Sequence, residues 1–166
     1  MQTTPQGRQH EDVQAMRYLQ AYWAAEADFK KGLAAYNQGK IRQAHAFFTG
    51  AVTGAPDELE FRAYHAYTSF SMERAVSQAQ AQRHIATLQD VLKRNKAQER
   101  QLDTAWALLG RAYREGGKPE QARRCFVQAL RIRPSNPDAR RELRRIAVAR
   151  KKAKEKGLFS WFFSGR

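Results

Sequence analysis

Apolar residues recur at helical spacing along most of the chain, in segments that turn residues separate. In the C-terminal half the pattern reads Trp106, Leu109, Gly110, Tyr113, Ala122, Phe126, Ala129 and Pro134. Part of it returns 78 residues upstream without a shift, as Gly32, Ala44, Phe48, Ala51 and Pro56. Small residues let two antiparallel helices approach closely, and large residues at helical spacing fill the space between them. The pattern therefore predicts two copies of one helical hairpin.

Glycine and proline mark the ends of the predicted helices. The first helix of each hairpin ends in a glycine-containing turn, at residues 37–40 and 116–119, where glycine supplies a left-handed cap. Pro56 and Pro134 then stop the second helix of each hairpin, because proline cannot continue it. Residues 135–138 supply turn and cap chemistry for a further helix.

A stack of such hairpins needs about three units to bury a continuous core, so we expect a middle unit. Its helices are expected at residues 60–72 and 77–93, with the extra residues of this degenerate unit at 73–80 and 95–101. Ala81, Ile85 and Leu88 keep the apolar spacing of its second helix. Together with the two hairpins, this unit predicts an array of three units over about residues 25–58, 59–94 and 103–136.

Upstream of the array, apolar residues keep a helical period from Glu11 to the turn at Asn37. This period predicts one long helix after a disordered stretch at residues 1–10. Terminal repeats need a covering element, so we interpret the helix as a cap over the first hairpin.

The net charge of +14 is concentrated near the C-terminus. From Ala139 onward, two residues are acidic and ten are basic, namely Arg140, Arg141, Arg144, Arg145, Arg150, Lys151, Lys152, Lys154, Lys156 and Arg166. A helix over residues 137–156 would bury Leu143 and Ile146 and leave the arginine pairs exposed. The segment therefore predicts a basic capping helix that Gly157 ends.

An aromatic tail at residues 157–166 follows this basic run and is unlike a solvated terminus. The candidate tail site comprises Lys151, Lys152, Lys154, Lys156, Leu158, Phe159, Trp161, Phe162 and Phe163. One interpretation is that the tail docks on this protein or on a partner. The other is insertion at a membrane interface, with the basic run meeting anionic lipid. The second interpretation predicts a peripheral, reversible association.

The sequence offers no recognisable catalytic or metal-binding spacing. The four histidines are scattered, so surface or satisfied histidines are expected in place of a metal site, and no cofactor is expected. Cys125 is the only cysteine and lies beside Phe126, which favours a structural thiol over a nucleophile. We therefore expect no enzymatic activity. Without an apolar run of about 18–20 residues or a signal-peptide pattern, a cytoplasmic location is expected, with a peripheral position at the inner face of the membrane as an option.

The basic composition raises nucleic-acid binding as an alternative function. A sequence pI of 10.4 and the arginine-rich helix give the electrostatic footprint of such a protein. The aromatic residues, however, fall on core spacings and not as stacking platforms. We expect weak, non-specific retention of nucleic acid at low salt.

The order Trp106, Leu109, Gly110, Tyr113, Ala122, Phe126 and Pro134 resembles the signature of the tetratricopeptide repeat, a helix–turn–helix unit of about 34 residues. The resemblance implies an all-α, right-handed superhelix of about three units with N- and C-terminal capping helices. The arrangement as a whole also resembles, more loosely, the C-terminal repeat region of bacterial proteins that carry a DnaJ-type domain. No His-Pro-Asp occurs here, so co-chaperone stimulation is not implied.

The resemblance further implies that the first helix of each unit lines a concave groove that binds a partner peptide or helix. The matching positions are Glu26, Phe29, Leu33, Tyr36, Asn37, Glu60, Ala63, Tyr67, Phe70, Ser71, Thr104, Ala107, Arg111, Arg114 and Glu115. Phe29, Tyr36, Tyr67 and Phe70 are expected to be exposed there, and the arginines make the other end cationic. Family members that clamp acidic chaperone tails carry Lys and Asn at the positions held here by Phe29, Leu33, Tyr64, Thr104 and Leu108, so that clamp is not expected. A non-enzymatic adaptor for a protein with a hydrophobic or acidic segment is the function that follows.

Overall fold

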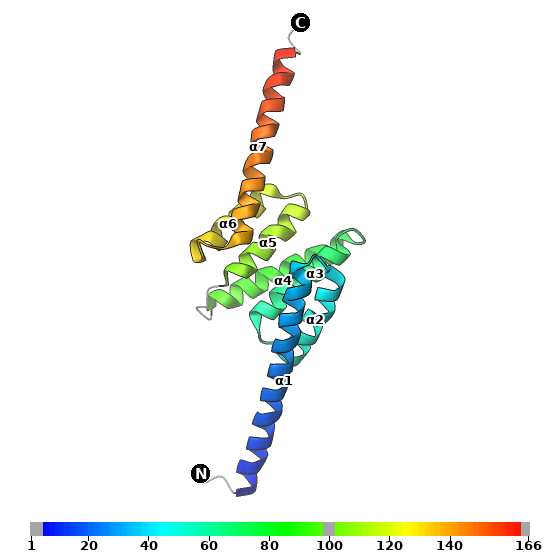
Figure 1. Cartoon of the computed structure of the whole chain (residues 1–166), viewed down its shortest axis with the longest axis vertical. Helices are drawn as coiled ribbons and strands as arrows, with labels where there is room; N and C mark the ends of the chain where they lie inside the picture. Colours follow the sequence, from blue (N-terminus) through cyan, green and yellow to red (C-terminus); the bar gives the residue numbers. More distant parts are fainter. Residues whose placement is uncertain (1–4, 98–101, 164–166) are drawn as a thin grey trace. The chain divides into compact units, whose positions relative to one another are not determined.

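The computed structural model describes the backbone of residues 5–97 and 102–163 and the side chains of residues 11–96 and 102–155. Within these ranges the chain forms helices and no strands (Figure 1). The helices are α1 (Pro5–Asn37), α2 (Ile41–Gly54), α3 (Leu59–Glu73), α4 (Gln78–Ala97), α5 (Asp103–Glu115), α6 (Pro119–Ile132) and α7 (Pro137–Phe163). The expected all-α repeat fold is thereby confirmed.

The chain divides into two compact units, Met1–Thr87 and Leu88–Arg166, with the boundary inside α4. In unit 1, α1 packs on α2 and α2 packs on α3. In unit 2, α5 packs on α6 and α6 packs on α7. The helices expected at residues 60–72 and 77–93 correspond to α3 and α4, and residues 98–101 of the second expected insertion lie outside the described residues.

The hairpin of α1 and α2 is built around one close approach. A Cβ atom at Gly32 would lie 2.5 Å from Cε1 of Phe48, so only glycine lets α1 come this close to the ring. Phe48 and its small neighbours Ala44 and Ala51 are fully buried. The turn that follows α1 needs the left-handed backbone of Gly39, whose φ is 74°.

The hairpin of α5 and α6 repeats this design in unit 2. A Cβ atom at Gly110 would lie 2.7 Å from Cε1 of Phe126, which is fully buried, and Gly117 takes a φ of 75° in the turn. The repeat read from the sequence is therefore a repeat of a three-dimensional contact. Trp106, expected among the residues that fill this interface, is only partly buried, so its role in the core is smaller than expected.

Two expectations for the ends of the chain are wrong. Helix α1 starts at Pro5, so the disorder expected over residues 1–10 does not hold from Pro5 onward, and residues 1–4 lie outside the described residues. Helix α7 continues through Gly157 to Phe163. An interior glycine costs a helix only about 1 kcal/mol, and here good helix formers precede it.

The N-terminal half of α1 does not cover the first hairpin, contrary to expectation. Helix α1 has 33 residues and α2 only 14, so the first part of α1 extends beyond α2 (Figure 1). Residues 11–20 are all exposed, and Trp23 is 58% exposed. Burial begins at Ala25, near the point where Gly54 of α2 meets α1.

Candidate functional site

The aromatic groove positions of unit 1 form a packed cluster. Phe29 stacks on Phe61 with ring centroids 4.3 Å apart, and Tyr36 meets Tyr64 edge to face at 5.4 Å. Tyr67 completes the cluster at 5.9 Å from Tyr36. The expected exposure of these residues is wrong, because aromatic residues of α3 cover those of α1. Phe29, Tyr36, Tyr67 and Phe70 are between 1% and 8% exposed, and Ala63 is fully buried.

The accessible groove positions of unit 1 are the polar and aliphatic ones. Asn37 is exposed at the end of α1, and Leu33 is partly exposed one turn earlier. Glu26, Glu60 and Ser71 are also partly exposed, and Glu26 forms an ion pair of 2.8 Å with Lys30. Among the expected groove positions of unit 1, Leu33 is therefore the apolar residue that a partner can contact.

In unit 2 the cationic groove positions meet acidic residues of α7. Asp138 lies 3.7 Å from Arg111 of α5 and 2.5 Å from Arg141 of its own helix. Glu142, which is fully buried, lies 3.2 Å from Arg114 of α5 and 3.0 Å from Arg145. Each acid thus bridges one arginine of α5 and one of α7.

These ion pairs occupy the groove end that was expected to bind an acidic partner: Arg111 and Arg114 of α5 pair with acids of α7. Arg111 and Arg114 are partly exposed, as are Thr104 and Glu115, whereas Ala107 is buried. The sequence does contain a signal for these ion pairs. Asp138 and Glu142 stand four residues apart, hence on one face of a helix that is otherwise rich in arginine.

A buried polar cluster fixes the start of α7. The Asn136 side chain donates a hydrogen bond of 2.6 Å to Asp103 and accepts one of 2.9 Å from the backbone N–H of Ala139. Arg133 lies 2.7 Å from the same Asp103 carboxylate. Asn136 therefore caps α7 and ties it to the first residue of α5, as its position in the expected cap segment indicated.

Three histidines gather between α2, α3 and α4 in unit 1. The rings of His45 and His65 stack at 4.9 Å, and His84 lies 2.8 Å from Glu73. Burial, reinforced by His45 and His84, lowers the pKa of His65 to about 4. Burial also lowers the pKa of His45, against the opposing effect of Glu73. Among the described residues, no group of three His, Cys, Asp or Glu side chains is placed to hold a metal ion.

Cys125 lies in the α5–α6 core. It is 5% exposed, and burial raises the pKa of its thiol to about 11. The thiol is therefore protonated near neutral pH and is a poor nucleophile.

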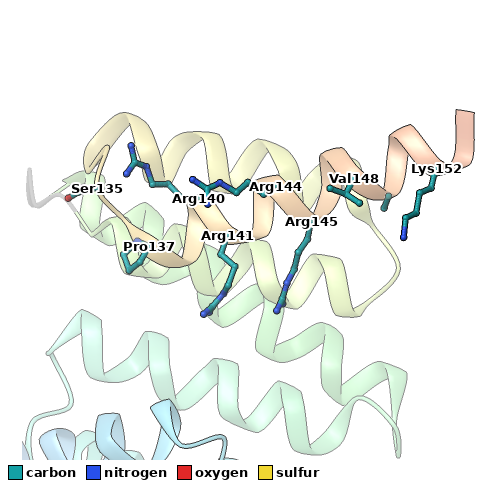
Figure 2. A pocket seen from close by; sticks show the side chains of 9 residues that line it. Ser135, Pro137, Arg140, Arg141, Arg144, Arg145, Val148 and Lys152 are labelled. Carbon is teal, nitrogen blue, oxygen red and sulfur yellow. The ribbon is translucent and has the colours of Figure 1, made fainter. Parts of the chain in front are cut away.

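The solvent-exposed face of α7 carries a hollow of about 770 Å³. Arg140 and Arg144 extend from one side of the helix, and Arg141, Arg145 and Lys152 extend from the other (Figure 2). Val148, 55% exposed, lies among them. We call this surface the outer face of α7.

Charge is divided very unevenly between the two units. Residues 1–87 contain nine basic and eight acidic residues, whereas residues 88–166 contain 21 basic and eight acidic residues. Unit 2 therefore carries +13 of the net charge of +14. In the part of the chain that the structure describes, no helix has the length and hydropathy that crossing a membrane requires.

Comparison with known proteins agrees with this geometry. The family model of the tetratricopeptide repeat matches residues 104–136, which span most of α5, all of α6 and the turn before α7. A search of curated proteins by sequence finds no match.

Solved structures share the fold over most of the chain. The TPR domain of Arabidopsis OM64 has a TM-score of 0.57 at 19% identity, covering 78% of this chain and 98% of that one. The first TPR domain of human RPAP3 has a TM-score of 0.57 at 20% identity, covering 80% and 96%. The first TPR of Spaghetti (RPAP3), bound to the HSP90 peptide SRMEEVD, has a TM-score of 0.53 at 21% identity, covering 77% and 94%. Residues 104–136 thus match the tetratricopeptide-repeat family model, and the chain as a whole is similar in fold to TPR domains.

Proposed function

We propose that the chain is a non-enzymatic adaptor that binds a protein partner. Tetratricopeptide repeats are protein-interaction modules, and one of the similar structures holds a peptide. The observation that carries the proposal is the repeated contact of Gly32 with Phe48 and of Gly110 with Phe126. The glycine and phenylalanine that recur in each hairpin are accounted for by packing, and we infer that recognition uses the outer helix faces.

The buried polar groups support a structural and not a catalytic use. Glu142 neutralises Arg114 and Arg145, and Asp103 binds Asn136. Cys125 has a raised pKa, so its thiol is protonated near neutral pH. Each of these groups is used within the fold of unit 2, whereas catalysis needs polar groups that converge on a substrate.

We place one contact of the partner at the accessible end of α1, around Leu33 and Asn37. Leu33 is partly exposed beside the buried aromatic cluster, and Asn37 is exposed where α1 ends. An apolar side chain flanked by hydrogen-bonding groups is the usual composition of a peptide-binding surface. The HSP90 peptide of the RPAP3 structure is acidic, whereas Phe29 and Leu33 offer no cation at these positions, so we propose a partner segment with an apolar side chain here.

Affinity capture from the native cell tests this proposal. The full chain is used as bait at about 150 mM salt after nuclease treatment, so that charge-driven nucleic-acid bridges are removed. We expect a specific protein that Leu33→Asp loses and that the matched variant Ala34→Asp, at an exposed neighbouring position of α1, retains. If the wild-type chain retains no protein, or retains only nucleic acid when nuclease is omitted, the adaptor function is wrong.

We also propose that the end of α7 attaches the protein reversibly to an anionic membrane. The supporting observation is that α7 is one helix from Pro137 to Phe163, which carries the basic run at residues 150–156 directly into the aromatic segment. Each basic residue near an anionic surface contributes roughly 1 kcal/mol, and a buried Phe roughly 1.5–3 kcal/mol. Docking of this segment on a partner or on the chain itself is the competing outcome of the vesicle experiment below.

A further inference from the structure

The outer face of α7 is opposite the face that packs on the repeat. Ala139, Glu142 and Ile146 are buried against the rest of unit 2 and recur at the spacing of one helix face. The opposite side of the helix holds the hollow, with Val148 more than half exposed. This face is therefore available to a partner while α7 stays docked.

The two sides of the outer face differ in how their charges are neutralised. Arg141 and Arg145 already contact Asp138 and Glu142. Arg140 and Arg144 are exposed, and among the described residues their side chains form no hydrogen bond or ion pair. Four arginines and Lys152 surround the hollow, and in the described part of the chain two acidic residues, Asp138 and Glu142, pair with them. The surplus of positive charge favours an anionic occupant.

The residues that line the hollow recur at a spacing that a second helix can match. Arg140, Arg144, Val148 and Lys152 follow one another at intervals of four residues, which is about 6 Å of helix per step and about 18 Å in all. A ridge of this kind accepts a second helix, whose own side chains recur at the same interval. Carboxylates four residues apart on such a helix would reach Arg140 and Arg144 together.

The apolar residues of the outer face favour an acidic protein segment over other polyanions as the ligand. Pro137, Val148 and Ala149 lie among the cations, and an acidic amphipathic helix buries them with its own apolar side chains. A nucleic-acid backbone offers phosphates but no apolar group for Val148. A lipid surface would need a broader apolar face than three small residues supply.

We propose that the outer face of α7 is a docking site for an acidic amphipathic helix of a partner protein. The site rests on the adaptor function proposed above and gives its partner a stated chemistry. This site does not recognise the C-terminal carboxylate of a partner, because its cations lie along the side of α7. It also differs from the contact at Leu33, which lies in the other unit.

Fluorescence anisotropy with a defined probe tests the site on the full chain. The probe is a labelled, C-amidated helical peptide of about 18 residues, roughly 27 Å long, with Glu at intervals of four and Leu beside it on the same face. Its matched control is a scrambled peptide of the same composition. Single- and double-stranded DNA and anionic vesicles are the competing ligands. All are measured at about 150 mM salt.

We expect the amphipathic peptide to bind at least about tenfold more tightly than the scrambled one. Arg140→Glu with Arg144→Glu should weaken it about tenfold or more, and Val148→Ser should weaken it several-fold. Lys93→Glu with Arg131→Glu gives the same net charge at exposed positions outside the outer face and should bind as the wild type does. Unchanged circular dichroism shows that each variant is folded.

The proposal is overturned if both peptides bind equally, or if the two double variants weaken binding equally, since net charge alone would then explain retention. It is also overturned if DNA or vesicles bind more tightly than the peptide and lose affinity in the Arg140/Arg144 variant while Val148→Ser leaves them unchanged. The adaptor function survives such a result if the Arg140/Arg144 variant still captures the native protein partner. If capture from the cell fails as well, both proposals fall.

Discussion

The close contact between Gly32 and Phe48 predicts that the substitution Gly32→Ala destabilises the first hairpin. The added Cβ would lie 2.5 Å from Cε1, 2.7 Å from Cδ1 and 3.1 Å from Cζ of Phe48. Carbon atoms prefer about 3.5–4.0 Å, so α1 and α2 must separate by about 1 Å or the ring must move. Phe48 is fully buried, so a movement of its ring displaces other side chains of the core.

Two opposing terms set the size of the effect. Overpacking a core costs about 1–3 kcal/mol, and alanine is better than glycine in a helix by up to about 1 kcal/mol. We therefore expect Gly32→Ala to lower the free energy of unfolding by about 1–2 kcal/mol. Gly50→Ala is the matched control in the same hairpin. Its Cβ would meet Oδ2 of Asp28 at 2.7 Å, and this carboxylate is the end of a partly exposed side chain that can rotate away.

Urea unfolding followed by circular dichroism measures both variants. We expect Gly32→Ala to lower the midpoint and Gly50→Ala to leave it unchanged or to raise it. Combining Gly32→Ala with Phe48→Leu should cost less than the sum of the two single changes, since the smaller side chain relieves the overlap. If Gly32→Ala is as stable as Gly50→Ala, or if the double variant is strictly additive, the assignment of this contact as the basis of the repeat is refuted.

Three further predictions concern other parts of the chain. The free energy of unfolding should fall as pH drops from 6.5 towards 4, because the unfolded chain then binds a proton that His65, with a pKa of about 4, does not. Urea unfolding across this pH range measures the effect. His65→Asn should make the fall smaller by on the order of 1–2 kcal/mol, a value that allows for the partial exposure of His65. An unchanged dependence of the free energy of unfolding on pH would contradict this. Asn136→Ala should lower the free energy of unfolding by about 2 kcal/mol, through loss of a helix cap and of a buried hydrogen bond to a carboxylate, whereas exposed Ser135→Ala should have little effect; equal melting curves would exclude this role. Deleting residues 158–166 should release the protein from anionic vesicles and leave partner capture intact; a lower melting midpoint with unchanged vesicle binding would instead mean that the segment packs on the repeats.

The helices of the hairpins and the turns between them could be predicted from the sequence. Gly39 and Gly117 have the positive φ that the turn pattern required, and Phe48 and Phe126 occupy equivalent buried positions. These features depend on local spacing and backbone conformation, which a sequence expresses directly. Asn136 as the cap of α7 belongs to the same class.

The exposure of the groove residues was not predictable in the same way. Phe29 and Tyr36 are buried because Phe61, Tyr64 and Tyr67 of another helix cover them. Family resemblance gives the position of a residue along the helix but not the size of the side chains across from it. The aromatic residues of α3 turn a recognition surface expected from the family into part of a core.

The packing of α1 and the end point of α7 could not be predicted from local sequence patterns either. The N-terminal half of α1 keeps a helical apolar period, yet its residues 11–20 are exposed, so periodicity alone did not show whether a partner element is present. Gly157 is a weak helix breaker, and the good helix formers before it offset its cost. The functional use of the remaining groove positions and of the tail is still a prediction.

Hydrogen–deuterium exchange of the full chain, alone and with the protein partner captured from the cell, tests the proposed binding surfaces most directly. Binding through the proposed surfaces predicts slower exchange in two segments, the end of α1 that contains Leu33 and Asn37 and the part of α7 that contains Arg140, Arg144 and Val148. Exchange in α6, which contributes neither surface, should not change. Protection confined to α6, or to residues 158–163, with the two proposed surfaces unchanged, would contradict the account.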